Sequence, residues 1–281
     1  MASYRFCRPD DIPLLVAAVN RCYDVHFPAA APLTVDEFRL EMKQLQLWPS
    51  NSMVASGGDG PVAVMLGTKR PREVLVRRIG VAPGYQRQGH GRHLLTSLAQ
   101  KLAVLGPPRL VAEVPAALEG ACEFFAAAGW RDEARLTDYV RGVASRRPPP
   151  ELLAPVTVRE LDALGLLPER SDLPWQRQAE SLRASAHELS GLAVVGGEEW
   201  AAWALFRDAG PGVEVLALGW GEGQPAQAAL APLLDGIQAG HPGPLRVAAL
   251  LPGELPEGLL AGLGFAPCAT THRFAAEVPV A

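Results

Sequence analysis

The feature that most constrains the fold of this 281-residue chain is an internal repeat of one α/β unit. The first half contains, in order, a β-rich run at 74–81, a helical pattern at 91–105, a strand pattern at 110–114, a short helix through Phe124 and Phe125, and a Gly129-Trp130 pair. The second half repeats this order at 213–220, 226–239, 245–250, Leu259-Leu260 and Gly264-Phe265. Strand runs that alternate with helices predict an α/β fold in each half. We expect Thr137–Val143 to close the first unit and Thr270–Val278 to close the second.

The spacing of the repeat is not uniform. The offset from Ile79-Gly80-Val81 to Leu218-Gly219-Trp220 is larger than the offset from Gly129-Trp130 to Gly264-Phe265. The second copy is therefore about four residues shorter across an interval that contains its strand-to-helix turn. Because the pattern has no period of 20–50 residues, it excludes a solenoid. The repeat indicates a duplication in which one turn has decayed.

A proline-rich segment divides the two copies. Residues 148–150 are three consecutive prolines behind charged residues, a composition typical of an extended linker. We therefore expect one domain at 1–145, a linker at 146–155 and a second domain at 156–281.

Composition excludes several classes of protein. The net charge of −4 argues against a broad nucleic-acid-binding face. Neither a secretory signal nor a run of 18 apolar residues is visible, so a cytoplasmic protein without membrane spans is expected. The cysteines are scattered with no metal-ligand spacing, which favours reduced thiols and no metal site; they are Cys7, Cys22, Cys122 and Cys268.

A glycine-rich turn follows the strand that ends at Val81. It reads Gln86-Arg87-Gln88-Gly89-His90-Gly91 and leads directly into the helical pattern. The first N–H groups of a helix have no intrahelical acceptor, and the helix dipole places about half a positive charge there. Glycines remove Cβ atoms that would hinder an approaching phosphate, and Arg87 and Arg92 add positive charge. The turn is therefore predicted to bind phosphate.

Two common phosphate-binding patterns do not fit this turn. A Walker loop needs a lysine and then serine or threonine, where Arg92-His93 stand. A dinucleotide fingerprint needs a small residue at the position of Leu94. The pattern Q/R-x-x-G-x-G/A after an apolar-x-Val-x-Pro segment is matched in full, at Gln86, Gly89 and Gly91, with Val81 and Pro83 in place. The alternative is that the glycines only make a tight turn.

Together with the strand at 110–114, the Phe-Phe helix and Gly129-Trp130, this motif resembles the GNAT superfamily of N-acetyltransferases, in a tandem two-domain form. The resemblance covers about residues 3–143 as an intact copy and 154–281 as a degraded one. It implies an α/β (α+β) fold of two GNAT-like domains, each with a mixed, mostly antiparallel central sheet flanked by helices. It also implies acetyl-CoA as cosubstrate.

The family's binding mode implies roles for the matching residues. The backbone of the strand end would pair with the pantetheine arm like an added strand, and the amides of the turn would hold the pyrophosphate. The implied coenzyme-binding residues are Ile79, Gly80, Val81, Gln86, Arg87, Gln88, Gly89, His90, Gly91 and Arg92.

The general acid is not identified by the motif. Many relatives carry a tyrosine in the pattern F-Y-x-x-x-G-F, and here Phe125 takes its place and cannot donate a proton. Leu118 stands where an asparagine is often found. We expect structural roles for Tyr85 and Tyr139, and solvated positions for His90 and His93 at the helix start.

For the general base, Glu73 and Glu113 are the candidates, because family members often carry a carboxylate on these strands that works through water. Solvation at the surface is the alternative for each. Asp24 and His26 could instead line the acceptor site. We expect Trp175, Trp200 and Trp203 to be core or interdomain residues.

The second copy offers Gly219-Trp220-Gly221-Glu222-Gly223-Gln224-Pro225, which has no basic residue, so productive coenzyme binding is not expected there. The sequence thus predicts an acetyl-CoA-dependent N-acetyltransferase acting on a primary amine of a small molecule or peptide through its first domain. A coenzyme A-binding regulatory or interaction protein without catalysis is the alternative.

Overall fold

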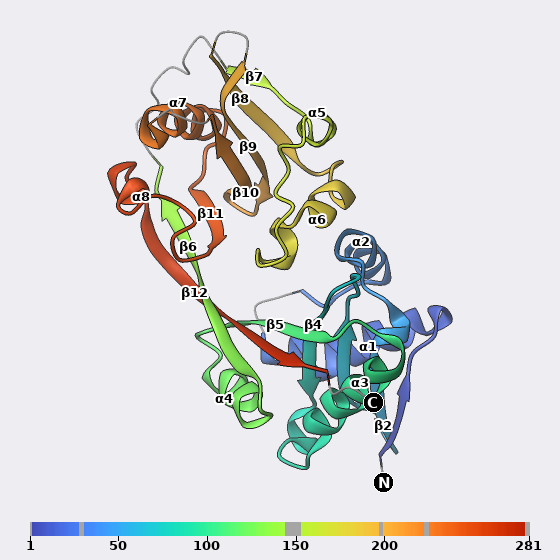
Figure 1. The fold of residues 1–281 in the computed structure, drawn as a ribbon. Coiled ribbons are helices and arrows are strands. Elements are labelled where there is room, and N and C mark those ends of the chain that lie inside the picture. Colours follow the sequence, from blue (N-terminus) through green and yellow to red (C-terminus); the bar gives the residue numbers. More distant parts are fainter. Residues whose placement is uncertain (1, 28–30, 144–152, 197–198, 222–224, 279–281) are drawn as a thin grey trace. The chain divides into compact units, whose positions relative to one another are not determined.

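The computed structural model describes residues 2–27, 31–143, 153–196, 199–221 and 225–278. The chain divides into two compact units (Figure 1). The first unit contains Met1–Val114, Leu118–Glu133 and His272–Ala281, and the second contains Pro115–Ala117 and Ala134–Thr271. The expected linker at 146–155 lies mostly outside the described residues, but its end, Leu153–Pro155, forms strand β7.

The sheet of the first unit is mixed and mostly antiparallel, as the sequence predicted. Strands β1 (Ser3–Phe6), β2 (Met53–Gly57), β3 (Gly60–Gly67) and β4 (Val74–Val81) pair antiparallel in chain order. Strand β5 (Arg109–Pro115) pairs parallel with β4, and the strand next to β5 is β12 (Ala266–Glu277).

Helices cover both faces of this sheet. They are α1 (Ile12–Cys22), α2 (Val35–Leu45), α3 (His90–Leu105) and α4 (Glu119–Ala127). Leu94 and Leu98 of α3 and Phe125 of α4 share a buried cluster with Val74 and Val76 of β4. On the opposite face, α1 and α2 bury another cluster that includes Leu15, Phe38, Val64 and Leu66. Each helix therefore buries one apolar stripe against the sheet.

The second unit has the same architecture. Its strands are β6 (Arg131–Arg141, whose first three residues belong to the first unit), β7, β8 (Ser190–Gly196), β9 (Glu199–Ala209), β10 (Gly212–Trp220) and β11 (Leu245–Leu250). Its helices are α5 (Val158–Ala163), α6 (Ala179–Ala184), α7 (Ala226–Ala239) and α8 (Leu259–Gly262). Helices α7 and α8 bury one face of the sheet, and α5 and α6 bury the other.

The pairing of the strands shows that the two copies of the sequence repeat have matching positions in the two sheets. Val74 pairs with Leu110 in the first unit and Val213 pairs with Leu245 in the second. The offset from Val74 to Val213 is the larger of the two spacings found in the sequence, and the offset from Leu110 to Leu245 is the smaller. The shorter interval of the second copy lies between these strands, so it includes the turn and helix that connect them.

The last strand of each unit differs from the expectation. Strand β6 pairs with β11, for example at Tyr139 and Val247, so most of it belongs to the second unit. The end of β12 belongs instead to the first unit, where Phe274 and Val278 join the cluster of α3 and α4. The first unit is therefore not residues 1–145. It contains only the first three residues of β6, and its final strand comes from the end of the chain. An apolar strand pattern does not specify its partner strand, which is why the sequence assigned both to the wrong unit.

All four cysteines are free thiols, and Cys7 and Cys22 are buried. Burial raises the pKa of each of these two thiols to about 11, opposite to what a nucleophilic cysteine needs. In the described ranges, no group of three or more His, Cys, Asp or Glu side chains could hold a metal ion. Among the same residues, no helix is long and apolar enough to cross a bilayer.

Candidate functional site

A β-bulge in β4 is the first element of the candidate site. Leu66 of β3 pairs with Arg78, but the next residue, Gly67, pairs with Val76, so Arg77 is an extra residue on β4. Adjacent strand residues normally point to opposite faces. Here Arg77 and Arg78 both reach Glu41 of α2, at 3.1 and 2.6 Å, which confirms that the bulge turns them to one side. A bulge of this kind bends its strand and ends regular pairing.

Pairing between β4 and β5 stops at this bulge. Within the described residues the parallel register covers Val74↔Leu110 and Leu75↔Val111, yet β4 continues to Val81 and β5 to Pro115. The edge of β4 from the bulge to Val81 therefore has peptide groups that are not paired with β5. An unpaired strand edge can accept an extended ligand with amide groups as an added strand. Ile79, Gly80 and Val81, the predicted pantetheine-binding residues, lie on this edge.

The predicted phosphate-binding turn joins this edge to α3. Gly89 is the N-cap residue of α3 and has a left-handed φ of 86°. The first backbone bond of the helix runs from the His93 N–H to the Gly89 carbonyl. The N–H groups of His90, Gly91 and Arg92 therefore precede the helical ladder and are available to an anion. Arg87, also left-handed at φ 62°, is exposed beside them.

Glycine is favoured at the two glycine positions of the motif for different structural reasons. A Cβ on Gly89 would meet nothing within 4 Å, so its left-handed backbone and the approach to the helix amides are what favour glycine. A Cβ on Gly91 would lie 3.1 Å from the ring of Phe124. Gly91 thus allows α4 to pack against α3, a reason that the sequence argument, which assigned both glycines to the phosphate, did not find.

Of the two histidines of the turn, His93 is exposed as expected and His90 is not. His90 is buried, and its Nδ1 forms a hydrogen bond with the Tyr4 hydroxyl at 2.5 Å. The ring of His93, although exposed, lies 3.9 Å from the Tyr4 ring, centroid to centroid. The guanidinium of Arg92 donates to the Ala127 carbonyl at the end of α4. These side chains hold the start of α3 in place, and the amides of the helix remain available to an anion.

The segment after α1 crosses the end of β4. A Cβ on Gly80 would lie 2.3 Å from the Cys22 carbonyl, so only glycine allows this crossing. His26 lies with its Nε2 3.3 Å from the Val81 carbonyl, which also accepts a hydrogen bond from Gln86. Burial raises the pKa of Asp24, an effect that Arg78 opposes. Asp24 and His26, the alternative residues for lining the acceptor site, thus lie beside the bulged strand.

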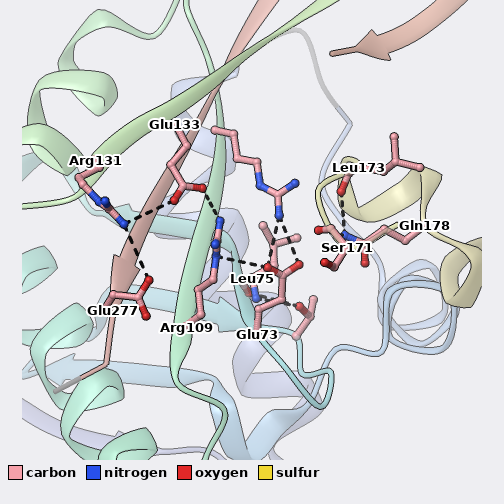
Figure 2. Close-up of polar contacts among 11 residues, drawn as sticks. Glu73, Leu75, Arg109, Arg131, Glu133, Ser171, Leu173, Gln178 and Glu277 are labelled. Carbon is pink, nitrogen blue, oxygen red and sulfur yellow. Dashed lines mark hydrogen bonds and ion pairs between the residues drawn. The ribbon is translucent and has the colours of Figure 1, made fainter. Parts of the chain in front are cut away.

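Glu73 lies immediately before the first residue of β4, and it is 4% exposed. Its carboxylate lies 3.3 Å from the guanidinium of Arg273 and 3.6 Å from that of Arg109. Figure 2 shows the contact between Glu73 and Arg109. Arg109 also pairs with Glu133. A buried carboxylate placed between two guanidinium groups forms ion pairs that tie together segments far apart in the chain. The contacts of Glu73 therefore favour a structural role, and its expected catalytic role remains a hypothesis.

We predict that Glu73→Gln destabilises the protein by about 3–5 kcal/mol, because breaking a buried ion pair leaves the charge of Arg273 uncompensated. Urea unfolding of the full chain would measure the change. Glu277→Gln is the matched control: Glu277 is 64% exposed and 3.8 Å from Arg131, so its loss should cost less than about 0.5 kcal/mol. Equal losses in both variants would contradict the structural role.

Glu113 is placed differently from Glu73. It lies on β5 beyond the last residue that pairs with β4, and it is half-buried. Leu110, Ala112 and Val114 of β5 face the cluster of α3 and α4, so alternation directs Glu113 to the opposite face, which α1 and α2 cover. Both predicted carboxylates therefore lie along β4 and β5, but they are not brought together.

Phe125, at the position of the family's tyrosine, is part of the core. Its ring lies 4.9 Å from that of Trp130 and 5.6 Å from that of Phe274. Tyr85 also packs against buried residues of the first unit, and Tyr139 against those of the second, consistent with the structural roles expected. Four further residues make contacts here that the sequence did not predict: Tyr4, Glu41, Arg109 and Arg273. Their contacts depend on tertiary packing between distant segments, which no local pattern reveals.

Comparison with known proteins gives one family match, within the first half of the chain. Residues 17–130 match the model of the acetyltransferase (GNAT) family. A search of curated proteins gave no match. Among solved structures, a GCN5-related N-acetyltransferase from Sphaerobacter thermophilus is similar with a TM-score of 0.69 and 14% identity, covering 99% of this chain and 96% of that one.

Two further structures extend this similarity. A tandem GNAT protein from the clavulanic acid biosynthesis pathway gives a TM-score of 0.64 at 15% identity and 99% coverage of both chains. A putative acetyltransferase from Pyrococcus horikoshii gives 0.59 at 15% identity, covering 99% of this chain and 90% of that chain. At these identities the likeness establishes the fold across both units, and the family match lies in the first half. Residues 17–130 therefore match the acetyltransferase (GNAT) family, and the whole chain has the fold of GNAT proteins, a tandem GNAT protein among them.

Proposed function

We propose that this protein is an N-acyltransferase that moves an acetyl group from acetyl-CoA to a primary amine of a small molecule or peptide, at the site of the first unit. The observation that carries the proposal is the continuity of the bulged edge of β4 with the amides at the start of α3. The unpaired peptide groups suit the amides of a pantetheine arm, and the helix start suits a pyrophosphate.

The reaction needs an attacking amine nitrogen, a thioester carbonyl carbon and two proton transfers. The new C–N bond forms as the C–S bond breaks, the amine loses a proton and the departing sulfur gains one. Holding the two reactants in line beside β4 can remove about 7–11 kcal/mol of the barrier. Glu113 is the better placed candidate base, because it lies on β5 beyond the last residue that pairs with β4.

Two measurements test this proposal. Titration calorimetry should show acetyl-CoA binding, and a thiol-release assay with a panel of amines should show turnover. Binding without thiol release by any amine would favour the second candidate, a coenzyme A-binding protein without catalysis. The burial of Phe125 among aromatic rings, with no hydroxyl at that position, is the observation that favours this candidate. Absence of binding would overturn both.

We predict that Glu113→Gln lowers kcat by about 10²- to 10⁴-fold, the usual contribution of a positioned general base. The Kd for acetyl-CoA should change little, because the predicted coenzyme contacts lie on β4 and α3. Steady-state kinetics with the best amine, together with calorimetry, would measure both quantities. Glu123→Gln, on the exposed side of α4, is the control and should keep full activity. An unchanged kcat in the Glu113 variant would remove it as the base.

A further inference from the structure

The second unit repeats the geometry that makes the site of the first. Strands β10 and β11 pair parallel over Val213–Val215, and a bulge follows at Leu216, the counterpart of Arg77 in the repeat. Both strands then continue beyond their last shared pair, to Trp220 and Leu250. The second unit therefore has the bulge and the end of pairing that, in the first unit, expose the edge of β4.

In the second unit a side chain of the protein spans this place. Arg177 is 4% exposed, and its Nε donates to the carbonyl of the bulge residue Leu216 at 2.7 Å. Its Nη1 donates to the Ala249 carbonyl on β11 at 3.0 Å. The same guanidinium pairs with the carboxylate of Glu254. One buried cation thus bridges the two strands just where they stop pairing with each other.

The surrounding residues fix Arg177 in this position. It ends a 3-10 turn, Trp175–Arg177, and its N–H donates to the Pro174 carbonyl at 2.8 Å. Trp175 is 1% exposed and anchors that turn in the unit. Ala249 has a left-handed φ of 48°, and its N–H donates to Asp138 at 2.6 Å while its carbonyl accepts from Arg177. A non-glycine residue keeps such a backbone only where several contacts hold it.

The first unit lacks this bridge in its described part. The Arg77 carbonyl, which matches that of Leu216, receives no side-chain donor among the described residues, and the Arg77 guanidinium points to Glu41 instead. The donors of Arg177 are planar N–H groups, as are the amides of a pantetheine arm. We propose that the Arg177 guanidinium takes, in the second unit, the place of the pantetheine amides, so that this unit holds a coenzyme-type site that its own chain blocks. This inference rests on the proposed function of the first unit.

Crystals soaked with S-acetylpantetheine, a neutral thioester without phosphates, test the proposal. The wild-type protein should bind one molecule, along β4. Arg177→Ala should bind a second, donating to the Leu216 and Ala249 carbonyls. Arg183→Ala is the control, because Arg183 is a half-exposed arginine of the same unit paired with Asp162 and Glu169; this variant should bind one molecule.

One result would overturn the inference. The second unit of Arg177→Ala is folded in the crystal, but no S-acetylpantetheine lies beside β10 at a ligand concentration that fills the site at β4. Ligand beside β10 in the wild type also overturns it. Should the single variant fail to fold, Arg177→Ala combined with Glu254→Gln removes the uncompensated carboxylate and is read in the same way. An empty site at β4 in every crystal would instead contradict the proposed function. The difference in ligand beside β10 between the wild type and Arg177→Ala would still test the role of Arg177.

Discussion

A chain that lacks His272–Ala281 is expected to lose the fold of its first unit while the second unit stays folded. The missing segment supplies the strand beside β5 and places Phe274 and Val278 in the cluster of α3 and α4. It also carries Arg273, which pairs with the buried carboxylate of Glu73. No other described strand of the first unit lies at that edge of β5.

The size of the effect follows from two terms. Removing a buried phenylalanine costs about 3–5 kcal/mol, and removing one partner of a buried ion pair costs about 3–5 kcal/mol. Their sum is comparable with the whole stability of an ordinary domain, about 5–15 kcal/mol. Loss of the backbone pairs of the strand adds to it. The first unit is therefore left with little or no net stability.

Hydrogen exchange resolves the two units in one experiment. In a chain that ends at Thr271, amides of α3 should lose their protection and amides of α7 should keep it. A chain that ends at Val278 is the control, because it retains Arg273, Phe274 and Val278, and should exchange like the full chain. Protection of α3 that is unchanged without residues 272–281 would show that the first unit does not need this strand.

The sequence predicted the local elements well because each depends on a local pattern. The run at 74–81 is β4 as expected, and the helical stripe at 91–105 is α3 with one more residue at its start. Gly89 was expected at the helix start, and its left-handed φ agrees with the choice of glycine. Hydrophobic periodicity and turn chemistry act over a few residues, so one sequence suffices to read them.

The features that were missed depend on residues far apart in the chain. Glu73 and Arg273 are separated by 200 residues, and the pairing of Arg177 with Glu254 spans 77. No local pattern predicted that two guanidinium groups would lie beside the carboxylate of Glu73. His90 was expected in solvent because it begins a helix, but Tyr4 of β1 covers it. Packing partners of this kind are set by the tertiary fold and leave no local signal.

Replacing Gly89 by tryptophan is expected to weaken acetyl-CoA binding by more than about 100-fold, which corresponds to roughly 3 kcal/mol. A Cβ at Gly89 meets no protein atom within 4 Å, so the side chain would stand in front of the α3 amides, and the left-handed φ adds backbone strain. Gly89→Ala separates the effect of backbone strain from that of side-chain bulk. It adds the strain of a left-handed backbone, about 1–2 kcal/mol, to the free and the bound protein alike, so it should lower stability while weakening binding far less than tryptophan does.

Gly221 supplies the matched control in the second unit. It follows β10 as the turn of the first unit follows β4, and a Cβ there would come no closer than 3.8 Å to another atom. Gly221→Trp should therefore leave the Kd for acetyl-CoA in calorimetry close to that of the wild type, with one coenzyme bound per chain. If the Gly221 variant lost binding and the Gly89 variant kept it, the working site would belong to the second unit. If both kept it, the pyrophosphate would not lie on the start of α3, because no bound anion could share that space with an indole ring.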